Sequence, residues 1–310
     1  MPFLYSVEED KRDKHRFMMI TGFEGGVSDL VIPEEIEGMR VEAVGNHSFS
    51  ARSDLRSVTI PGSVRILYGF AFHNCRNLKK ISLCDSIDDY YDGVCRQCDS
   101  LEDIEITMNR GWFEVIRNFL ADNDRSLRFL IHEKAQLQGG PNIVTSLTFP
   151  EYVYDFNENT MARTIQFSIA GSGMFYRECV DRRSINYREY DRLFEKARID
   201  GGRTAQAIAL GRLLFPTQLE DAFRLQYEEY VRENADSILT ELVSRAETDD
   251  APKQELKRLL DYSRETKIIP ESALDGAIAL SADKKLTEVS AILMKSGVGG
   301  TSEGGVTFEF

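Results

Sequence analysis

The sequence lacks a long apolar run and is short of basic residues. No stretch approaches the roughly 20 apolar residues that a membrane helix needs. Its 38 lysines and arginines are outnumbered by 51 aspartates and glutamates, which gives a formal net charge of −13. Proteins that bind nucleic acid or anionic lipid present basic surfaces, so this balance argues against both partners. Acidic charge by itself indicates solubility and identifies no partner.

Cysteine is scarce and odd in number. Five cysteines in 310 residues suit a reduced compartment better than a disulfide framework. The first residues, MPFLYSVEEDKRDKHRF, contain no apolar signal-peptide core and no small-residue cleavage site. We therefore expect a cytoplasmic protein, although a chain cut behind a signal peptide would look the same.

The first half contains an internal repeat. Leu55, Leu78 and Leu101 follow one another at a fixed step of 23 residues. Six mostly apolar columns keep this step: Leu55/Leu78/Leu101, Val58/Ile81/Ile104, Ile60/Leu83/Ile106, Val41/Val64/Ile87, Val44/Leu67/Tyr90 and Phe49/Phe72/Cys95. Such a period predicts a solenoid, because one rung cannot bury its apolar face without its neighbours.

Each rung is expected to contribute one short strand. In Val58-Thr59-Ile60 alternate side chains point inward, so Thr59 faces out, and Pro61 ends the strand because it lacks a ladder donor. Outward positions of stacked rungs form a strip of the kind through which solenoids bind partners. The predicted binding positions are Ser57, Thr59, Lys80, Ser82, Asp103 and Glu105. The alternative is a plain solvated face, since this strip carries no aromatic anchor.

The two ends of the array depart from the repeat. FLYSVEED and HRFMMITGF read as two strands joined by a charged turn, which would cap the open edge. LVIPEEIEGMRVEAVG is a rung with extra residues around Gly38. Downstream, GWFEVIRNFLADN has helical spacing, and VTSLTFPE at 144–151 is strand-like. The predicted helix face consists of Trp112, Val115, Ile116 and Phe119.

The repeat resembles the BspA-like leucine-rich repeat family over about residues 20–130. The resemblance rests on these residues of the sequence: Val58-Thr59-Ile60-Pro61, Val64, Ala71-Phe72 and Asn74-Cys75-x-x-Leu78. LVIPEEIEGMRVEAVG is also similar to that family's usual first rung. The third rung departs from the pattern, with Cys84 in place of proline and Cys95 in place of phenylalanine. Surface-exposed members of the family imply an adhesin or glycan-binding protein as an alternative role.

From about Tyr187 the pattern changes to helices. Segments such as TAQAIALGRLLF, QLEDAFRLQYEEYVRENADSILTELVSRAE and LTEVSAILMKS carry apolar residues at three- and four-residue steps. Breakers at 201–202, Pro216, 249–252 and Pro270 separate these segments. Short helices with short links predict antiparallel pairs. The last ones have an ankyrin-like or HEAT-like rhythm without a firm period.

The predicted fold class is α+β and multi-domain. An N-terminal leucine-rich repeat solenoid of short parallel strands precedes an all-α helical-hairpin domain. Residues 1–150 are assigned to the solenoid with its β-hairpin cap, and 151–186 to a connecting segment. Residues 187–297 are assigned to the helical domain, and the Gly-rich end, 298–310, to a flexible tail.

Sulfur chemistry has little support. Cys95-Arg-Gln-Cys98 has the spacing of a redox dithiol or of half a zinc site. However, both cysteines fall in inward repeat columns and no second CxxC follows, so core packing is the preferred interpretation. Cys179 has no histidine at a recognisable catalytic spacing, so it is not predicted to be a nucleophile.

Ion-binding motifs are incomplete. Ala170-Gly-Ser-Gly173, followed by Arg177, lacks the spacing of a phosphate loop, so a tight turn is preferred. The acidic run, consisting of Asp85, Asp88, Asp89 and Asp92, lacks the EF-hand spacing, so a solvated loop is preferred.

Histidines give no sign of a metal site. The four histidines form no HxH or HExxH pair. His47 and His73 fall in the turns of the solenoid and are expected to be partly exposed. We predict no metal, no cofactor and no catalytic residue.

The sequence thus predicts a non-catalytic protein–protein interaction module or scaffold. Its protein partner is unknown, and neither nucleic acid nor membrane is expected. The adhesin alternative would require a signal peptide or an anchor. A second alternative is an enzyme hidden in the helical half. That enzyme would need a pocket with convergent polar groups around Arg177, Glu178, Tyr190 and Asp191.

Overall fold

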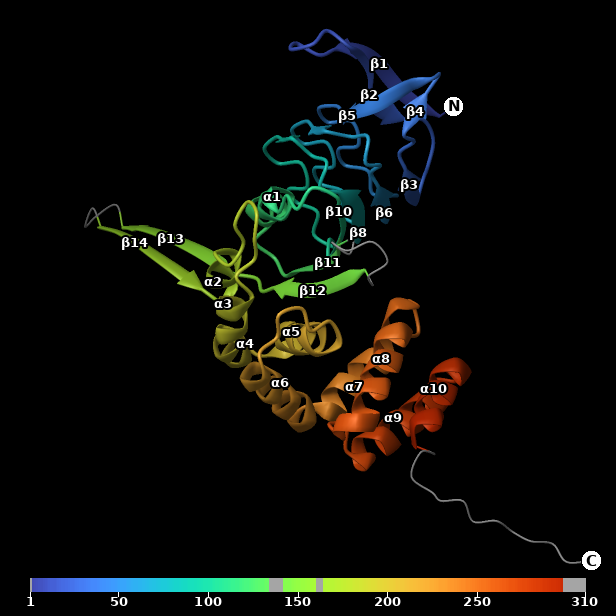
Figure 1. Cartoon of the computed structure of the whole chain (residues 1–310), viewed down its shortest axis with the longest axis vertical. Coiled ribbons are helices and arrows are strands. Elements are labelled where there is room, and N and C mark those ends of the chain that lie inside the picture. The colour runs from blue at the N-terminus through green and yellow to red at the C-terminus, as the bar shows by residue number, and fades with distance from the viewer. Residues whose placement is uncertain (1, 134–141, 160–163, 298–310) are drawn as a thin grey trace, which may run out of the picture. The chain divides into compact units, whose positions relative to one another are not determined.

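A computed structural model describes residues 2–133, 142–159 and 164–297 (Figure 1). The chain divides into two compact units. The first comprises residues 1–208 with 217–219, and the second comprises 209–216 together with the chain from Glu220 onward. The predicted solenoid followed by helices is confirmed. The residue boundaries drawn from the sequence stay a prediction, and the predicted tail, 298–310, lies outside the described residues.

Sheet B of the first unit runs β12-β11-β10-β8-β6-β3. Its repeat strands are β3 (Asp29–Val31), β6 (Ser57–Thr59), β8 (Lys80–Cys84) and β10 (Asp103–Met108). These strands pair in parallel, and Val58, Ile81 and Ile104 lie in register. A step of 23 residues along the chain therefore corresponds to a step of one strand across the sheet. β11 (Leu127–Glu133) continues the parallel order, and β12 (Ile143–Phe149) closes the sheet antiparallel.

Sheet A forms a second wall of the coil, with order β1-β2-β5-β7-β9. Its members are β1 (Phe3–Glu9), β2 (Arg16–Phe23), β5 (Met39–Val44), β7 (Ile66–Leu67) and β9 (Asp89–Tyr90), and β4 (Glu35–Ile36) pairs with β5. The sequence predicted one strand per rung, but the middle rungs each contribute two. The predicted N-terminal hairpin extends sheet A, because β2 pairs in parallel with β5.

The repeat columns form the core between the walls. Phe49 and Phe72 are fully buried and stack with ring centroids 5.3 Å apart. Behind them, the thiol of Cys75 donates to the carbonyl of Phe49 at 3.0 Å, and that of Cys98 donates to Phe72 at 3.1 Å. Burying one such large side chain contributes about 1.5–3 kcal/mol, so each added rung stabilises its neighbours.

Helix α1 (Glu114–Asp122) takes the place of the next turn segment of the stack, although β11 continues sheet B. Within the stack, Phe70 and Phe72 donate their N–H groups to carbonyls of the following rung. The equivalent N–H groups of Gly93 and Cys95 donate instead to the two carboxylate oxygens of Asp122, at 3.0 and 3.1 Å. The hydroxyl of Tyr90 also donates to Asp122, at 2.8 Å. One carboxylate therefore replaces part of a missing rung.

The predicted helix face is confirmed for Val115, Ile116 and Phe119, which are buried on α1. It is wrong for Trp112, which lies before the first turn of α1 and is half-buried. The prediction for Asp85 is wrong. The sequence placed this residue in a solvated loop, but it is fully buried. Its carboxylate accepts from the backbone N–H groups of Asn109, Arg110 and Trp112 at 2.7–3.1 Å, which fixes the turn before α1.

The remainder of the first unit follows sheet B, and part of it packs on edge strand β12. It contains a hairpin of β13 (Val153–Asn159) and β14 (Thr164–Ala170), then α2 (Gly173–Arg177), α3 (Tyr187–Arg192) and α4 (Phe194–Asp200). Tyr190 is fully buried, and its hydroxyl donates to the carbonyl of Thr148 at 2.6 Å and accepts from its N–H at 2.9 Å. A single side chain thus satisfies both groups of one residue on edge strand β12.

The second unit is helical. Helix α5 (Gly202–Leu214) spans the two units, and α6 (Asp221–Glu233), α7 (Ala235–Arg245), α8 (Ala251–Thr266), α9 (Glu271–Asp283) and α10 (Thr287–Gly297) follow. The long periodic segment after Pro216 is two helices, because the chain leaves helical geometry at Asn234. No helix in the described part of the chain is long and apolar enough to cross a bilayer.

The last four helices are two stacked hairpins. α7 packs on α8 and α9, and α10 packs on α9 and α8. The first helices begin at Ala235 and Glu271 and the second at Ala251 and Thr287, so both steps are 36 residues. Lys253 on α8 bonds Glu288 on α10 at 2.8 Å. The structure therefore supplies the period that the sequence rhythm left open.

We expect Asp122→Ala to destabilise the solenoid by about 3 kcal/mol, because it leaves two backbone N–H donors and a tyrosine hydroxyl without an acceptor. The measurement is urea unfolding followed by the fluorescence of Trp112, the single tryptophan, which lies beside α1. Asp124→Ala is the matched control, since that neighbouring side chain is exposed. Equal losses in both variants would contradict the capping role.

Candidate interaction surface

The six predicted positions lie on sheet B in two rows, each following one register across three rungs. Row one is Ser57, Lys80 and Asp103, and row two is Thr59, Ser82 and Glu105. Inward neighbours such as Val58 and Ile81 are buried, whereas Thr59 and Lys80 are exposed and the other row members are half-buried. The structure therefore brings all six together on one outward face, with neighbouring strands about 4.8 Å apart. Whether they bind anything stays a prediction.

The charges on this face are largely matched within the protein. Glu105 receives Lys80 Nζ at 2.6 Å on one oxygen and His132 Nε2 at 2.9 Å on the other. Asp103 forms a bidentate pair with Arg128 at 2.7 and 3.0 Å. Burial alone would raise the pKa of Glu105, but the hydrogen bond and charge of Lys80, with His132, outweigh it and lower the pKa. The sequence had not identified Arg128 and His132 as members of this surface.

The lowered pKa of Glu105 predicts an acid-sensitive solenoid. Its stabilisation is present above the ordinary glutamate pKa and is lost as pH falls through the lowered value. We expect Glu105→Gln to be less stable than wild type at pH 7, with the difference shrinking toward pH 3. Trp112-monitored urea unfolding between these pH values measures it. Exposed Glu102→Gln is the control, and a gap independent of pH would refute the prediction.

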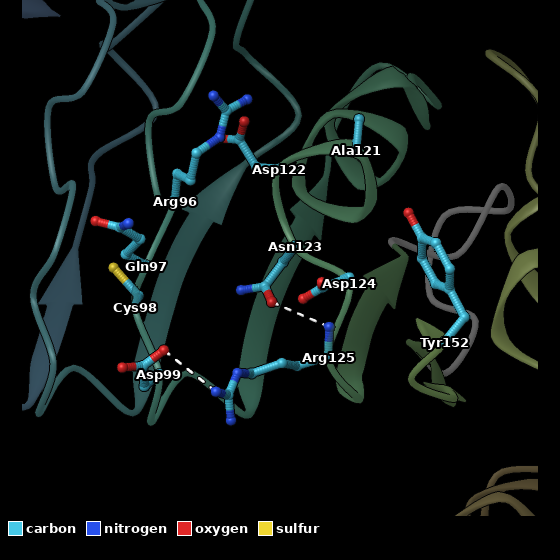
Figure 2. A pocket seen from close by; sticks show the side chains of 10 residues that line it. All are labelled: Arg96, Gln97, Cys98, Asp99, Ala121, Asp122, Asn123, Asp124, Arg125 and Tyr152. Atoms are coloured by element: carbon cyan, nitrogen blue, oxygen red, sulfur yellow. Dashed lines mark hydrogen bonds and ion pairs between the residues drawn. The ribbon is translucent and has the colours of Figure 1, made fainter. Parts of the chain in front are cut away.

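A polar pocket of about 390 Å³ lies between the turn of the third rung and the end of α1 (Figure 2). One side is the third-rung loop, Arg96–Asp99, and the other is the end of α1 and the residues after it, 121–125, with Tyr152. Arg125 pairs with Asp99 at 3.3 Å, and Asp122 is occupied by its capping bonds. With these groups engaged, the pocket shows no convergent set of polar groups aimed at a ligand.

Comparisons with known proteins locate the repeat. A family model described as BspA type leucine rich repeat region matches residues 27–131 in six copies. Those residues contain the stacked rungs described above. Residues 27–131 are a BspA-type leucine-rich repeat region. No curated protein matched the chain.

Solved structures with similarity to this chain are bacterial. A leucine rich cell surface protein from Faecalibacterium prausnitzii is 22% identical with a TM-score of 0.28, and the match covers 34% of this chain and 31% of that one. The T. pallidum leucine rich repeat protein is 19% identical with a TM-score of 0.26, covering 34% and 68%. A leucine-rich repeat protein from Bacteroides capillosus is 21% identical with a TM-score of 0.28, covering 36% and 89%. The chain thus matches under a third of the Faecalibacterium protein.

The cysteines of the BspA-type repeat are packing residues. Cys95 and Cys98 are each 1% exposed, and none of the chain's five cysteines is in a disulfide. Burial raises the pKa of the Cys95 thiol, and the hydrogen bond with Cys75 and burial raise that of Cys98. Burial likewise raises the pKa of Cys179, to about 12. The core-packing interpretation of the CxxC is confirmed, because buried neutral thiols are poor nucleophiles and metal ligands.

We expect Cys84, the one half-buried cysteine, to react first with a thiol reagent on the native protein. Cys84→Ser should remove the fast phase, and Cys98→Ala should leave it intact. A stopped-flow titration with an aromatic disulfide reagent at pH 8 measures both. A fast phase that requires Cys95 and Cys98 would instead indicate an accessible dithiol.

The residues of the enzyme alternative serve the fold. The Arg177 guanidinium donates to the carbonyls of Pro150, Asn123 and Arg125 at 2.6–3.0 Å, and burial lowers its pKa to about 10. Tyr190 holds strand β12, Asp191 is buried, and Glu178 is exposed. Arg177 therefore joins the segments around it and does not point into an open pocket.

The glycine motif before Arg177 is a turn, as predicted. Gly171 has a φ of +91°, and a Cβ there would lie 2.9 Å from the carbonyl of Glu151. A Cβ on Gly173 would collide with the carbonyl of Pro150. Both positions require glycine because the backbone of 150–151 passes directly against them.

One possible metal-ligand cluster occurs among the described residues, at Asp10, Asp13 and His15. Both ring nitrogens of His15 already contact carboxylates, Asp13 at 2.6 Å and Glu42 at 3.0 Å. The hydrogen bonds to Asp13 and Glu42 raise the pKa of His15, which suits an imidazolium and disfavours a metal ligand. This cluster ties the β1–β2 turn to β5. His47 is exposed and His73 half-buried, as predicted.

Proposed function

We propose that the protein is a non-catalytic interaction module whose BspA-type repeat presents the outer rows of sheet B to a protein partner. The observation that carries this proposal is the register of Ser57, Lys80 and Asp103 with Thr59, Ser82 and Glu105. Regular rows from successive rungs offer an extended, rigid surface, and binding through such surfaces is the common use of solenoids. Leucine-rich repeats of this type indicate a protein-binding or surface-interaction role in general.

The chemistry of the rows favours a polar partner. The hydroxyl of Thr59 can donate and accept, and that of Ser82, which donates to Glu105 at 3.3 Å, can still accept. Asp103 and Glu105 already hold Arg128, Lys80 and His132. A partner would therefore meet a patterned surface with little net charge. Since aromatic anchors are missing from these rows, we expect moderate affinity and recognition by shape. The glycan-binding adhesin is the alternative, and one similar protein is described as a cell surface protein.

The test uses a double variant that keeps every ion-pairing residue of this face. Thr59→Arg with Ser82→Arg adds two large cations to row two, and we expect it to abolish capture of a protein partner from lysate of the source cell. The matched control adds the same charge elsewhere, with Gln254→Arg and Ser272→Arg on exposed helical positions. Both double variants are first checked for wild-type urea unfolding.

A partner that is retained by wild type and the control, and lost by the row-two variant, supports the proposal. Equal retention by all three proteins contradicts the use of this face. A glycan array on wild type and the row-two variant distinguishes the adhesin alternative. Glycan binding without any protein partner would replace the proposed function.

A further inference from the structure

The outer face of sheet A differs from that of sheet B, because it carries aromatic side chains. Leu67 is fully buried, so its neighbours Ile66 and Tyr68 point outward on β7 and just beyond it. The ladder continues past the strands, since Tyr68 N–H donates to Val44 and Tyr91 N–H donates to Leu67. Tyr68 and Tyr91 therefore occupy equivalent positions on adjacent rungs.

The two tyrosine rings form a short stack. Their centroids are 5.1 Å apart and their planes differ by 18°. Tyr68 is half-buried, whereas Tyr91 is 49% exposed. The stack ends at the preceding rung, where Gly45 occupies the position equivalent to Tyr68. A large aromatic group left in solvent on a rigid rung is the kind of anchor that protein interfaces use.

Carboxylates without cationic partners accompany this stack. Asp89, two residues before Tyr91, and Glu8 on β1 have no ion pair in the described ranges, and Glu8 accepts only from Ser6. Burial raises the pKa of Tyr68, and so do the charges of Tyr91, Glu8 and Asp89, so both acids act on Tyr68.

A basic side chain on this wall, that of Arg65, is already engaged. Arg65 donates to Glu42 at 2.5 and 3.0 Å, and it pairs more loosely with Asp10 at 3.6 Å and Asp88 at 3.9 Å. Asp88 in turn pairs with Arg110 at 2.7 Å. These pairs run along the wall beside the tyrosines and leave Glu8 and Asp89 uncompensated.

We propose that the outer face of sheet A around Tyr68 and Tyr91 binds an arginine- or lysine-rich segment of a protein partner. A guanidinium or ammonium group would lie on the exposed ring of Tyr91 and be compensated by Asp89, while Glu8 adds negative charge on the Tyr68 side of the stack. Aromatic rings attract cations through their electron-rich faces, and the acids add charge complementarity. This surface is separate from the sheet B rows, so the proposal does not depend on the proposed function.

The test uses the full chain and a fluorescein-labelled peptide of alternating arginine and serine, titrated by fluorescence anisotropy at 50 and 150 mM salt. We expect saturable binding to wild type. Tyr91→Leu and Asp89→Asn should each weaken it at least fivefold, and Tyr91→Phe should change it less than twofold because the ring is kept. The control for net charge is Asp275→Asn on an exposed site of α9. It should have less than a twofold effect.

Two results would overturn the proposal. One is no saturable binding of the peptide to wild type. The other is an equal loss in Asp89→Asn and Asp275→Asn, which would mean unspecific attraction to an acidic protein. If Tyr91→Leu fails the urea-unfolding check, Asp89→Asn and Glu8→Gln decide, since both replace unpaired carboxylates without changing side-chain size. The sheet B variant Thr59→Arg/Ser82→Arg should bind the peptide like wild type.

Discussion

The hydrogen bonds from one rung to the next are the interaction on which the first unit depends. Phe70 and Phe72 donate to the following rung, and the same pattern one rung earlier joins Phe49 to Ala71. These bonds require a constant step, so every side-chain column repeats with it. The buried phenylalanines, the thiol–carbonyl bonds and both outer faces are consequences of that single register.

A stack of this kind must be closed at its ends, and the chain does so by different means. At the beginning, an antiparallel hairpin adds to sheet A and is tied to it through His15 and Glu42. At the far end, Asp122 substitutes for the carbonyls of a missing rung. Sheet B ends in antiparallel β12, and one tyrosine hydroxyl satisfies the backbone N–H and C=O groups of its Thr148. Each closure satisfies backbone groups that would otherwise invite another strand.

Two surfaces with different chemistry result from the same repeat. The outer rows of sheet B are polar, and their charges are paired internally. On the outer face of sheet A, the exposed Tyr91 lies two residues from Asp89, which has no ion pair in the part of the chain that the structure describes. Charges that are already compensated contribute less to binding than uncompensated ones, because a partner must first compete with the internal pair. The two faces are therefore suited to different partners.

The sequence by itself determined the solenoid, its core columns and the six outward positions of sheet B, because a fixed period and strand alternation are local properties. It also placed most of the helices, but it missed α2 and the breaks at Leu193 and Asn234. Only the tertiary structure decided which residues of different rungs face one another. Asp85 in a run of acids looked solvated, but turned inward onto three N–H groups. Likewise Arg128, Asp122 and the Tyr68–Tyr91 pair gained their roles from neighbours on other rungs, which no local pattern specifies.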